Sequence, residues 1–252
     1  MKVNRDELGI PKLGREAIEK TSEWFLSQIA NYTLRETVLL PTNLGYLIND
    51  LRDGGFCTFS HDGELGYKSN GLPCLGMYSF SRKHITISKD LAKDDPRYSF
   101  TCAHEIAHFY LHSKVHPRAY QEQGEVELRD SARDFVSIQP NSGPRGLMEW
   151  QANRFAASIL MPQATVRAVL TKVQGELGIG RRGRIWLDNQ PHIKHDYHRV
   201  LRGVAQHYNV SQAVVEVRLR EMRMIHVSSR YGLQPIRDAD LELALRDLFY
   251  VK

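Results

Sequence analysis

The chain has 252 residues, of which 42% are hydrophobic and 25% charged, and its formal net charge is +5. It can bury a core in one main domain and a smaller one. No window approaches the ~20 apolar residues that cross a bilayer, and the N-terminal segment lacks the apolar stretch of a secretory signal, so we expect a cytoplasmic protein without membrane contact. Cys57, Cys74 and Cys102 are odd in number and widely spaced, which argues against a disulfide framework or a cysteine zinc site and indicates buried thiols.

The first third of the chain predicts helices followed by short strands. Residues 15–52 have helical patterns, with a second helix opening after Pro41 and ending near Gly54. Residues 56–88 alternate glycines with short apolar runs, which predict strands such as CLGMYSF and KHITIS. We take His84–Ser88 as a candidate edge strand that could hold an extended substrate; the alternative is a central strand without a free edge.

The stretch from His104 to His108, HEIAH, carries the chemistry. On a helix, at about 100° per residue, the two histidines lie within roughly 40° of each other, so both imidazoles can reach one ion. Zinc suits two neutral imidazoles and a third protein ligand, which leave a fourth position for water. Glu105 points about 100° away from His104 and suits a base acting on that water. The alternative is an amphipathic helix whose histidines are satisfied at the edge of the core.

The position of a third ligand decides the kind of zinc site. The metzincin pattern would place a third histidine where this chain has Lys114. His112 lies about 80° around the helix and roughly 12 Å along it from His104, so it cannot easily share the ion.

Glu149 is the better third ligand. It lies with Asn153 on the edge of an apolar stripe at helical spacing that ends at Pro162. The stripe consists of Met148, Ala152, Phe155, Ala156 and Ile159. Glu149 can complete a His-His-Glu site, while Asn153 can hold the outer hydrogen bond of a ligand. The alternative is an ordinary first-turn glutamate favoured by the helix dipole.

Two segments together resemble a known family. FTCAHEIAHFYLH (100–112) followed by EWQANRFAASILMP (149–162) resembles the ImmA/IrrE zinc metallopeptidases, whose signature is HExxHxxLH followed by ExEAxxFAxxLLMP. The resemblance implies the zinc ligands His104, His108 and Glu149 and the catalytic base Glu105. Gln151 departs from the signature, because the family usually has a second glutamate there.

The connection between the two segments, residues 113–147, is longer than the resemblance leads one to expect. Its prolines, glycines and charges predict a surface course, with a short helix within 124–138. Because both flanking helices carry ligands, the connection could act as a lid or a substrate-selecting loop. Four residues are candidates for contacts with the substrate or with the developing oxyanion: Tyr110, His112, His116 and Tyr120. The alternative for each of them is simple packing or solvation.

The C-terminal part is basic. Residues 180–230 carry ten Lys or Arg against four acids, a net charge of +6. Within them, residues 197–225 predict a helix, a tight turn at Asn209–Ser211 and a second helix. This resembles the helix-turn-helix-like segment that follows the catalytic motifs in the family. This segment could bind DNA, or it could be a helical hairpin that closes the peptidase domain or docks a protein. We favour the hairpin. The arginines that would contact DNA or a partner are Arg218, Arg220 and Arg223.

We therefore expect an α+β fold: a mainly helical zincin-like core with a small mixed β-sheet in residues 1–178, then a basic helix-turn-helix-like domain in residues 179–252. The expected activity is that of a zinc-dependent endopeptidase. The resemblance implies a specific intracellular substrate, a co-encoded helix-turn-helix (XRE-type) transcriptional repressor, cut to relieve repression in a stress response or mobile element. The alternatives are a non-proteolytic, zinc-containing DNA-binding regulator and a toxin or defence component controlled by a partner protein.

Overall fold

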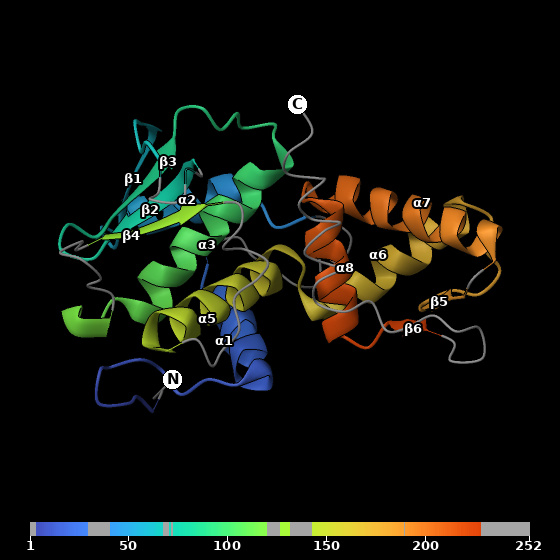
Figure 1. Cartoon of the computed structure of the whole chain (residues 1–252), viewed down its shortest axis with the longest axis horizontal. Helices are drawn as coiled ribbons and strands as arrows, with labels where there is room; N and C mark the ends of the chain where they lie inside the picture. Colours follow the sequence, from blue (N-terminus) through green and yellow to red (C-terminus); the bar gives the residue numbers. More distant parts are fainter. Residues whose placement is uncertain are drawn as a thin grey trace. The chain divides into compact units, whose positions relative to one another are not determined.

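The structure of the chain is a computed structural model (Figure 1). It describes residues 4–29, 41–67, 71, 73–119, 127–131, 143–188 and 190–227, with the backbone alone at 127–131. Two compact units share the chain. Met1–Tyr32 and Asn43–Leu160 make the first unit, and Thr33–Thr42 and Met161–Lys252 make the second. The predicted functional division at residue 178 stays a prediction, while the compact units themselves divide between Leu160 and Met161.

The first unit combines helices with one small sheet. Its elements are α1 (Arg15–Ser27), α2 (Leu44–Asp53), β1 (Thr58–Gly63), β2 (Cys74–Ser79), β3 (His84–Ser88), α3 (Pro96–His112), the 3-10 turn η1 (Pro117–Ala119), β4 (Glu127–Ser131) and α5 (Gly143–Leu160). The second predicted helix begins at Leu44 and is capped by Asn43, whose side chain accepts a hydrogen bond from the Tyr46 amide at 3.2 Å. The helices and strands of this unit confirm the prediction of a mainly helical α+β core with a small mixed sheet.

The sheet has the order β1-β3-β2-β4. β3 pairs in parallel with β1 and antiparallel with β2, so it has a neighbour on each side. The expectation that His84–Ser88 is an edge strand is therefore wrong. Burial agrees with its central place, because four of its five residues are buried on consecutive positions and so on both faces of the sheet.

β4 corrects a second expectation. It lies in the connection where we predicted a surface course with a short helix, and it pairs antiparallel with β2 along Leu128↔Tyr78 and Arg129↔Met77. A charged stretch offers no apolar face that a helix could bury. At the edge of the sheet, its backbone groups form hydrogen bonds with β2 instead. The connection therefore extends the sheet beside the helix that carries the histidines.

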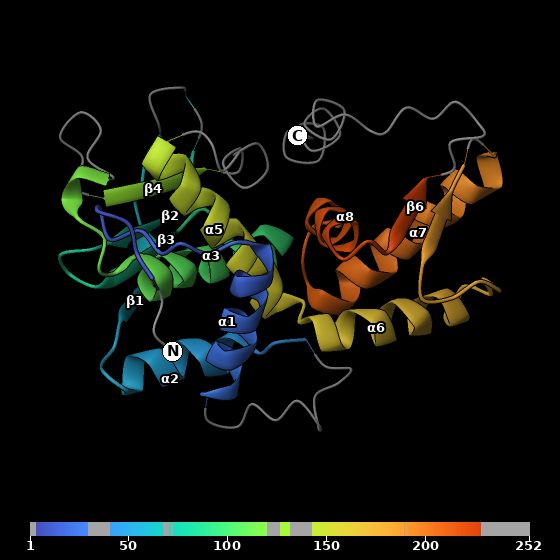
Figure 2. The same ribbon diagram turned by 90° about the horizontal axis from the view of Figure 1, so that it is seen from below.

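α3 packs between the sheet and α5 in the first unit (Figures 1 and 2). Asp95 caps the start of α3 by accepting a hydrogen bond from the Arg97 amide at 2.8 Å, and Pro96 fits the first helical position. Small buried side chains occur on both helices: Ala103 and Ala107 on α3, and Ala152 and Ala156 on α5. Small side chains let two helix axes approach closely, which brings the ligand-bearing edges of α3 and α5 together.

The second unit contains α6 (Gln163–Glu176), β5 (Ile185–Leu187), α7 (Pro191–Tyr208), α8 (Gln212–Glu221) and β6 (Ile225–Val227). α7 ends at Asn209 in the left-handed region (φ 51°), and Ser211 caps α8 by accepting from the Val214 amide. The predicted helix, tight turn and helix are confirmed in this segment. α6, which we expected in the first domain, packs against α7. Within the described ranges, no helix has the length and apolar character to cross a membrane.

Candidate metal centre

His104, His108 and Glu149 converge in the core of the first unit. Nε2 of His104 lies 2.9 Å from Nε2 of His108 and 3.1 Å from Oε2 of Glu149. The same carboxylate oxygen lies 3.4 Å from Nε2 of His108. Both histidines are 0% exposed and Glu149 is 3% exposed. One helix presents two imidazoles from adjacent turns, and the neighbouring helix presents the carboxylate.

This donor set fits a metal ion. One potential ligand atom from each of the three residues lies within 4.8 Å of the others, a spacing that one ion can bridge. Oε1 of Glu149 is buried and has no hydrogen-bond partner among the described residues, so an ion would satisfy an oxygen that otherwise bears a desolvation cost. Burial raises the pKa of Glu149, but a positive charge on His108 outweighs burial and holds that pKa well below its usual range. A bound cation would supply the same positive charge, so the site favours the ionised carboxylate that metal binding requires.

The comparison with known families agrees with this geometry. The family model Peptidase_M78, described as the IrrE N-terminal-like domain, matches residues 67–220. The chain belongs to this family. The resemblance to ImmA/IrrE peptidases is thereby confirmed, and the M78 match supports a metallopeptidase-type activity, the hydrolysis of peptide bonds. No curated protein matches the chain.

Glu105 of this M78 peptidase is fully buried and faces β2. A Cβ added at Gly76 would stand 2.4 Å from Oε1 of Glu105, so the carboxylate lies directly over the strand. The role of Glu105 as the catalytic base stays a prediction.

His112 lies next to His108, one turn further along α3. Its Nδ1 lies 3.1 Å from Nδ1 of His108, and its Nε2 lies 3.0 Å from Oε1 of Gln151. Both ring nitrogens are engaged and the side chain is 0% exposed, so this geometry does not support a contact with substrate. Burial, followed by the charge of His108, holds the pKa of His112 well below its usual range, and the ring is neutral. Sequence reasoning did not assign Gln151 a part in the site, although its departure from the family signature was a signal.

The other candidates are spread over the first unit. The Tyr110 ring packs 4.6 Å from that of Phe25 and 5.4 Å from that of Phe155, which is aromatic packing and not an oxyanion contact. His116 is exposed and accepts a hydrogen bond from the Arg118 amide. Tyr120 lies outside the described residues. Asn153 is half-buried one turn beyond Glu149 on α5, and its predicted hydrogen bond to a ligand stays a prediction.

The three cysteines are free and buried, as expected. Sγ of Cys57 donates to the Lys83 carbonyl at 3.1 Å, and burial raises the pKa of this thiol to about 12. Burial likewise raises the pKa of Cys102 to about 12. Thiols in this state are poor metal ligands, because only the thiolate binds a metal well.

The three arginines singled out in the second unit have unlike surroundings. Arg218 is 2% exposed and donates from Nε and Nη2 to the Met161 carbonyl at 3.1 and 3.0 Å. Nη2 of Arg220 lies 2.7 Å from a carboxylate oxygen of Glu216. Arg223 is exposed. The prediction that Arg218 contacts DNA or a partner is wrong, because a buried guanidinium that binds a carbonyl cannot reach a phosphate.

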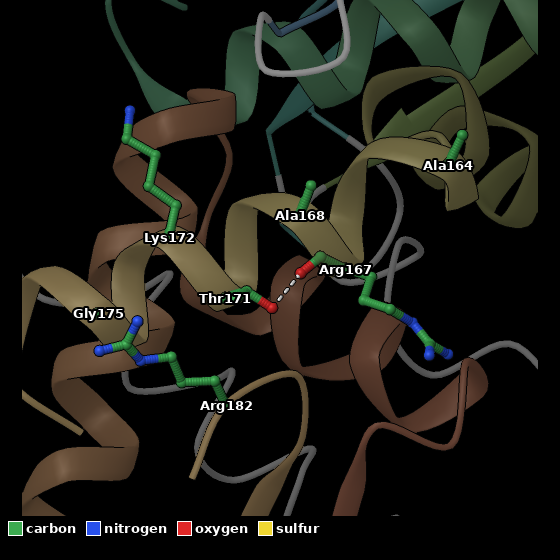
Figure 3. Close-up of a pocket in the computed structure, with 7 residues that line it drawn as sticks. All are labelled: Ala164, Arg167, Ala168, Thr171, Lys172, Gly175 and Arg182. Carbon is green, nitrogen blue, oxygen red and sulfur yellow. Dashed lines mark hydrogen bonds between the residues drawn. The ribbon is translucent and has the colours of Figure 1, made fainter. Parts of the chain in front are cut away.

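A pocket of about 590 Å³ lies along α6 in the second unit (Figure 3). Its lining consists of Ala164, Arg167, Ala168, Thr171, Lys172, Gly175 and Arg182. Figure 3 shows the side chains of Arg167, Lys172 and Arg182 around small residues of the helix. None of the residues of the metal centre lines this pocket, so it is separate from the chemistry of the first unit.

Proposed function

We propose that this chain is a zinc-dependent endopeptidase. The observation that carries the proposal is the convergence of His104, His108 and Glu149, with Glu105 next to the first histidine on the same helix. Two neutral imidazoles and one carboxylate form a ligand set typical of catalytic zinc, since three protein ligands leave a position for water. Zinc held there would polarise a peptide carbonyl and lower the pKa of water.

Metal binding and proton transfer are carried out by different side chains of the site. His104, His108 and Glu149 hold the ion, and their burial between two helices and a sheet keeps their geometry fixed. The carboxylate of Glu105 accepts a proton from the attacking water and returns it to the nitrogen of the leaving amine. That nitrogen leaves as a neutral amine because Glu105 supplies the proton.

The substrate that we propose is a single partner protein, a co-encoded helix-turn-helix transcriptional repressor whose cleavage relieves repression. The resemblance to ImmA/IrrE peptidases suggests this class of substrate. A cytoplasmic location and a role in stress response or mobile-element control belong to the same proposal.

The contacts of α8 count against a DNA-binding regulator that uses this helix. Arg218 is buried and Arg220 is paired with Glu216, which leaves Arg223 as the exposed member of the three. One exposed arginine provides little of the phosphate contact on which DNA affinity depends. A toxin or defence component controlled by a partner finds no specific support in these contacts.

The test uses the repressor encoded beside the gene for this chain. We expect zinc-loaded wild type to cut it at one site or a few sites, and Glu105→Gln to bind zinc and lose at least ~100-fold in rate. An unrelated denatured protein serves as the control for narrow specificity and should stay intact. A zinc-loaded Glu105→Gln protein that cuts the repressor at the wild-type rate would overturn the mechanism.

A further inference from the structure

A line of buried hydrogen bonds leads away from the metal centre. It begins at Nδ1 of His108, the ring nitrogen not used for the ion, which lies 3.1 Å from Nδ1 of His112. Nε2 of His112 lies 3.0 Å from Oε1 of Gln151. The amide nitrogen of Gln151 donates to the Pro11 carbonyl at 2.6 Å and approaches the Leu13 carbonyl at 3.5 Å. His108, His112 and Gln151 are each 0% exposed, so water does not compete for these contacts.

The carbonyl of Pro11 determines which group donates and which accepts in each hydrogen bond of this line. A carbonyl oxygen can only accept, so Gln151 must turn its NH₂ group toward Pro11 and its Oε1 toward His112. Oε1 in turn can only accept, so Nε2 of His112 carries a proton, and a ring with that single proton has a bare Nδ1. His108 must then donate from Nδ1, so its Nε2, which faces Glu149 and His104, is the nitrogen that can give a lone pair to the metal.

We propose that His112 and Gln151 are positioning residues that hold His108 in the tautomer able to bind the metal through Nε2, and that the Pro11 carbonyl sets their direction. The proposal rests on metal binding by the proposed zinc site. A glutamine at position 151 does not fix the tautomer by itself. If its amide were reversed, His112 would donate from Nδ1, and the proton of His108 would lie on Nε2, the nitrogen that faces the metal.

The acceptor comes from a segment outside the family match. Residues 4–13, the N-terminal strap, precede the matched range of 67–220. Arg5 ties the strap to the end of α3 by donating to the Gly9 carbonyl at 2.6 Å and the Leu111 carbonyl at 3.1 Å. Asp6 Oδ1 accepts from the amide of Ile10 at 2.8 Å. The strap therefore holds Pro11 in place, and the position of the Pro11 carbonyl affects metal binding through Gln151.

Zinc affinity, measured by competition with a chromophoric chelator, tests the proposal without any substrate. Gln151→Leu removes the acceptor facing His112, and we expect its zinc affinity to fall by about 10–100-fold. Gln174→Leu is the matched control: Gln174 is also a buried glutamine, 2% exposed, with hydrogen bonds to Arg184 and Gly183 in the second unit. It should lose stability and keep wild-type zinc affinity. Gln151→Glu still accepts from His112, so its affinity should lie closer to wild type than that of Gln151→Leu.

The outcomes separate this proposal from the proposed function. A wild type that binds no zinc overturns the zinc enzyme itself. A wild type that binds zinc, with Gln151→Leu binding equally well, overturns the positioning role alone. Nitrogen NMR of the zinc-loaded wild type with labelled histidines needs no variant. We expect His112 to carry its proton on Nε2 with Nδ1 bare, and the opposite pattern would contradict the proposal even if Gln151→Leu failed to fold.

Discussion

Gly76 of β2 lies directly against the carboxylate of Glu105 on α3. A Cβ at position 76 would stand 2.4 Å from Oε1 of Glu105 and 2.7 Å from Cγ2 of Thr101, closer than real Cβ atoms come to other heavy atoms. Glycine lets the strand pass this near to the helix without displacing either side chain. The absence of a side chain at position 76 therefore sets where the proposed base can lie.

Gly76→Ala should move the Glu105 carboxylate and leave the metal ligands in place. A displacement near 1 Å can lower a rate by about 100-fold, and we expect a loss of that order in repressor cleavage with unchanged zinc content. The comparison is with Gly180→Ala, since a Cβ at Gly180 meets nothing within 4 Å. Wild-type cleavage by Gly76→Ala would show that the position of Glu105 tolerates this shift.

Glu149→Ala should abolish tight zinc binding. Wild type should hold about one zinc per chain after dialysis against a weak chelator, and the variant well below that, because two imidazoles alone make an incomplete site. Glu16→Ala, which removes an exposed carboxylate paired with Lys20, should retain zinc like wild type. Metal analysis by mass spectrometry checks both proteins. Equal zinc in Glu149→Ala would remove Glu149 from the ligand set.

The cap of α3 should make stability depend on pH in the acid range. Hydrogen bonds from Arg97 outweigh burial and lower the pKa of Asp95. Its stabilising effect is thus complete above its unfolded pKa of about 3.9 and is lost as the pH falls through the lower folded value. We expect Asp95→Ala to lower the free energy of unfolding by about 1 kcal/mol at pH 7, and the difference to shrink below about pH 4.

Asp95→Asn is the companion variant for this measurement. Asparagine can cap the helix but does not titrate, so its difference from wild type should also change in the acid range. Urea titrations at pH 7 and pH 3 measure both effects. A difference between wild type and Asp95→Ala that stays constant with pH would contradict the assignment.

Arg218 should stabilise the second unit. Its removal leaves the Met161 carbonyl without two charged donors, and we expect Arg218→Ala to lower the free energy of unfolding by about 2–3 kcal/mol. Arg223→Ala changes an exposed arginine and should stay within about 0.5 kcal/mol of wild type. Denaturant unfolding compares the two. Equal stability of the two variants would mean that the buried hydrogen bonds contribute nothing net.

Local periodicity was a good guide where neighbouring residues decide the structure. His104 and His108 share a helix face because four residues make about one turn, and this holds wherever the helix packs. The edge of the apolar stripe likewise indicated Glu149, since a residue at the border of a buried face can point toward the neighbouring helix. The turn at Asn209 and the cap at Ser211 were local signals too.

Contacts between distant segments were not encoded in such patterns. The apolar alternation of His84–Ser88 predicted a strand but not its central place, and the charged stretch at Glu127–Ser131 became a strand only because β2 offered a partner. Arg218 showed the same limit. Its charge suggested a surface role, while packing buried it against Met161.

Two histidines, the adjacent glutamate and the ordered second motif are local signals, and they identified an M78 peptidase before any fold was known. The groups that surround those residues became visible only in the folded chain. Gln151 reaches Pro11 across 140 positions of the chain, and His104 reaches Glu149 across 45. Helical spacing is a property of adjacent turns, whereas these approaches depend on how whole elements pack, and packing is settled by burial over the entire unit.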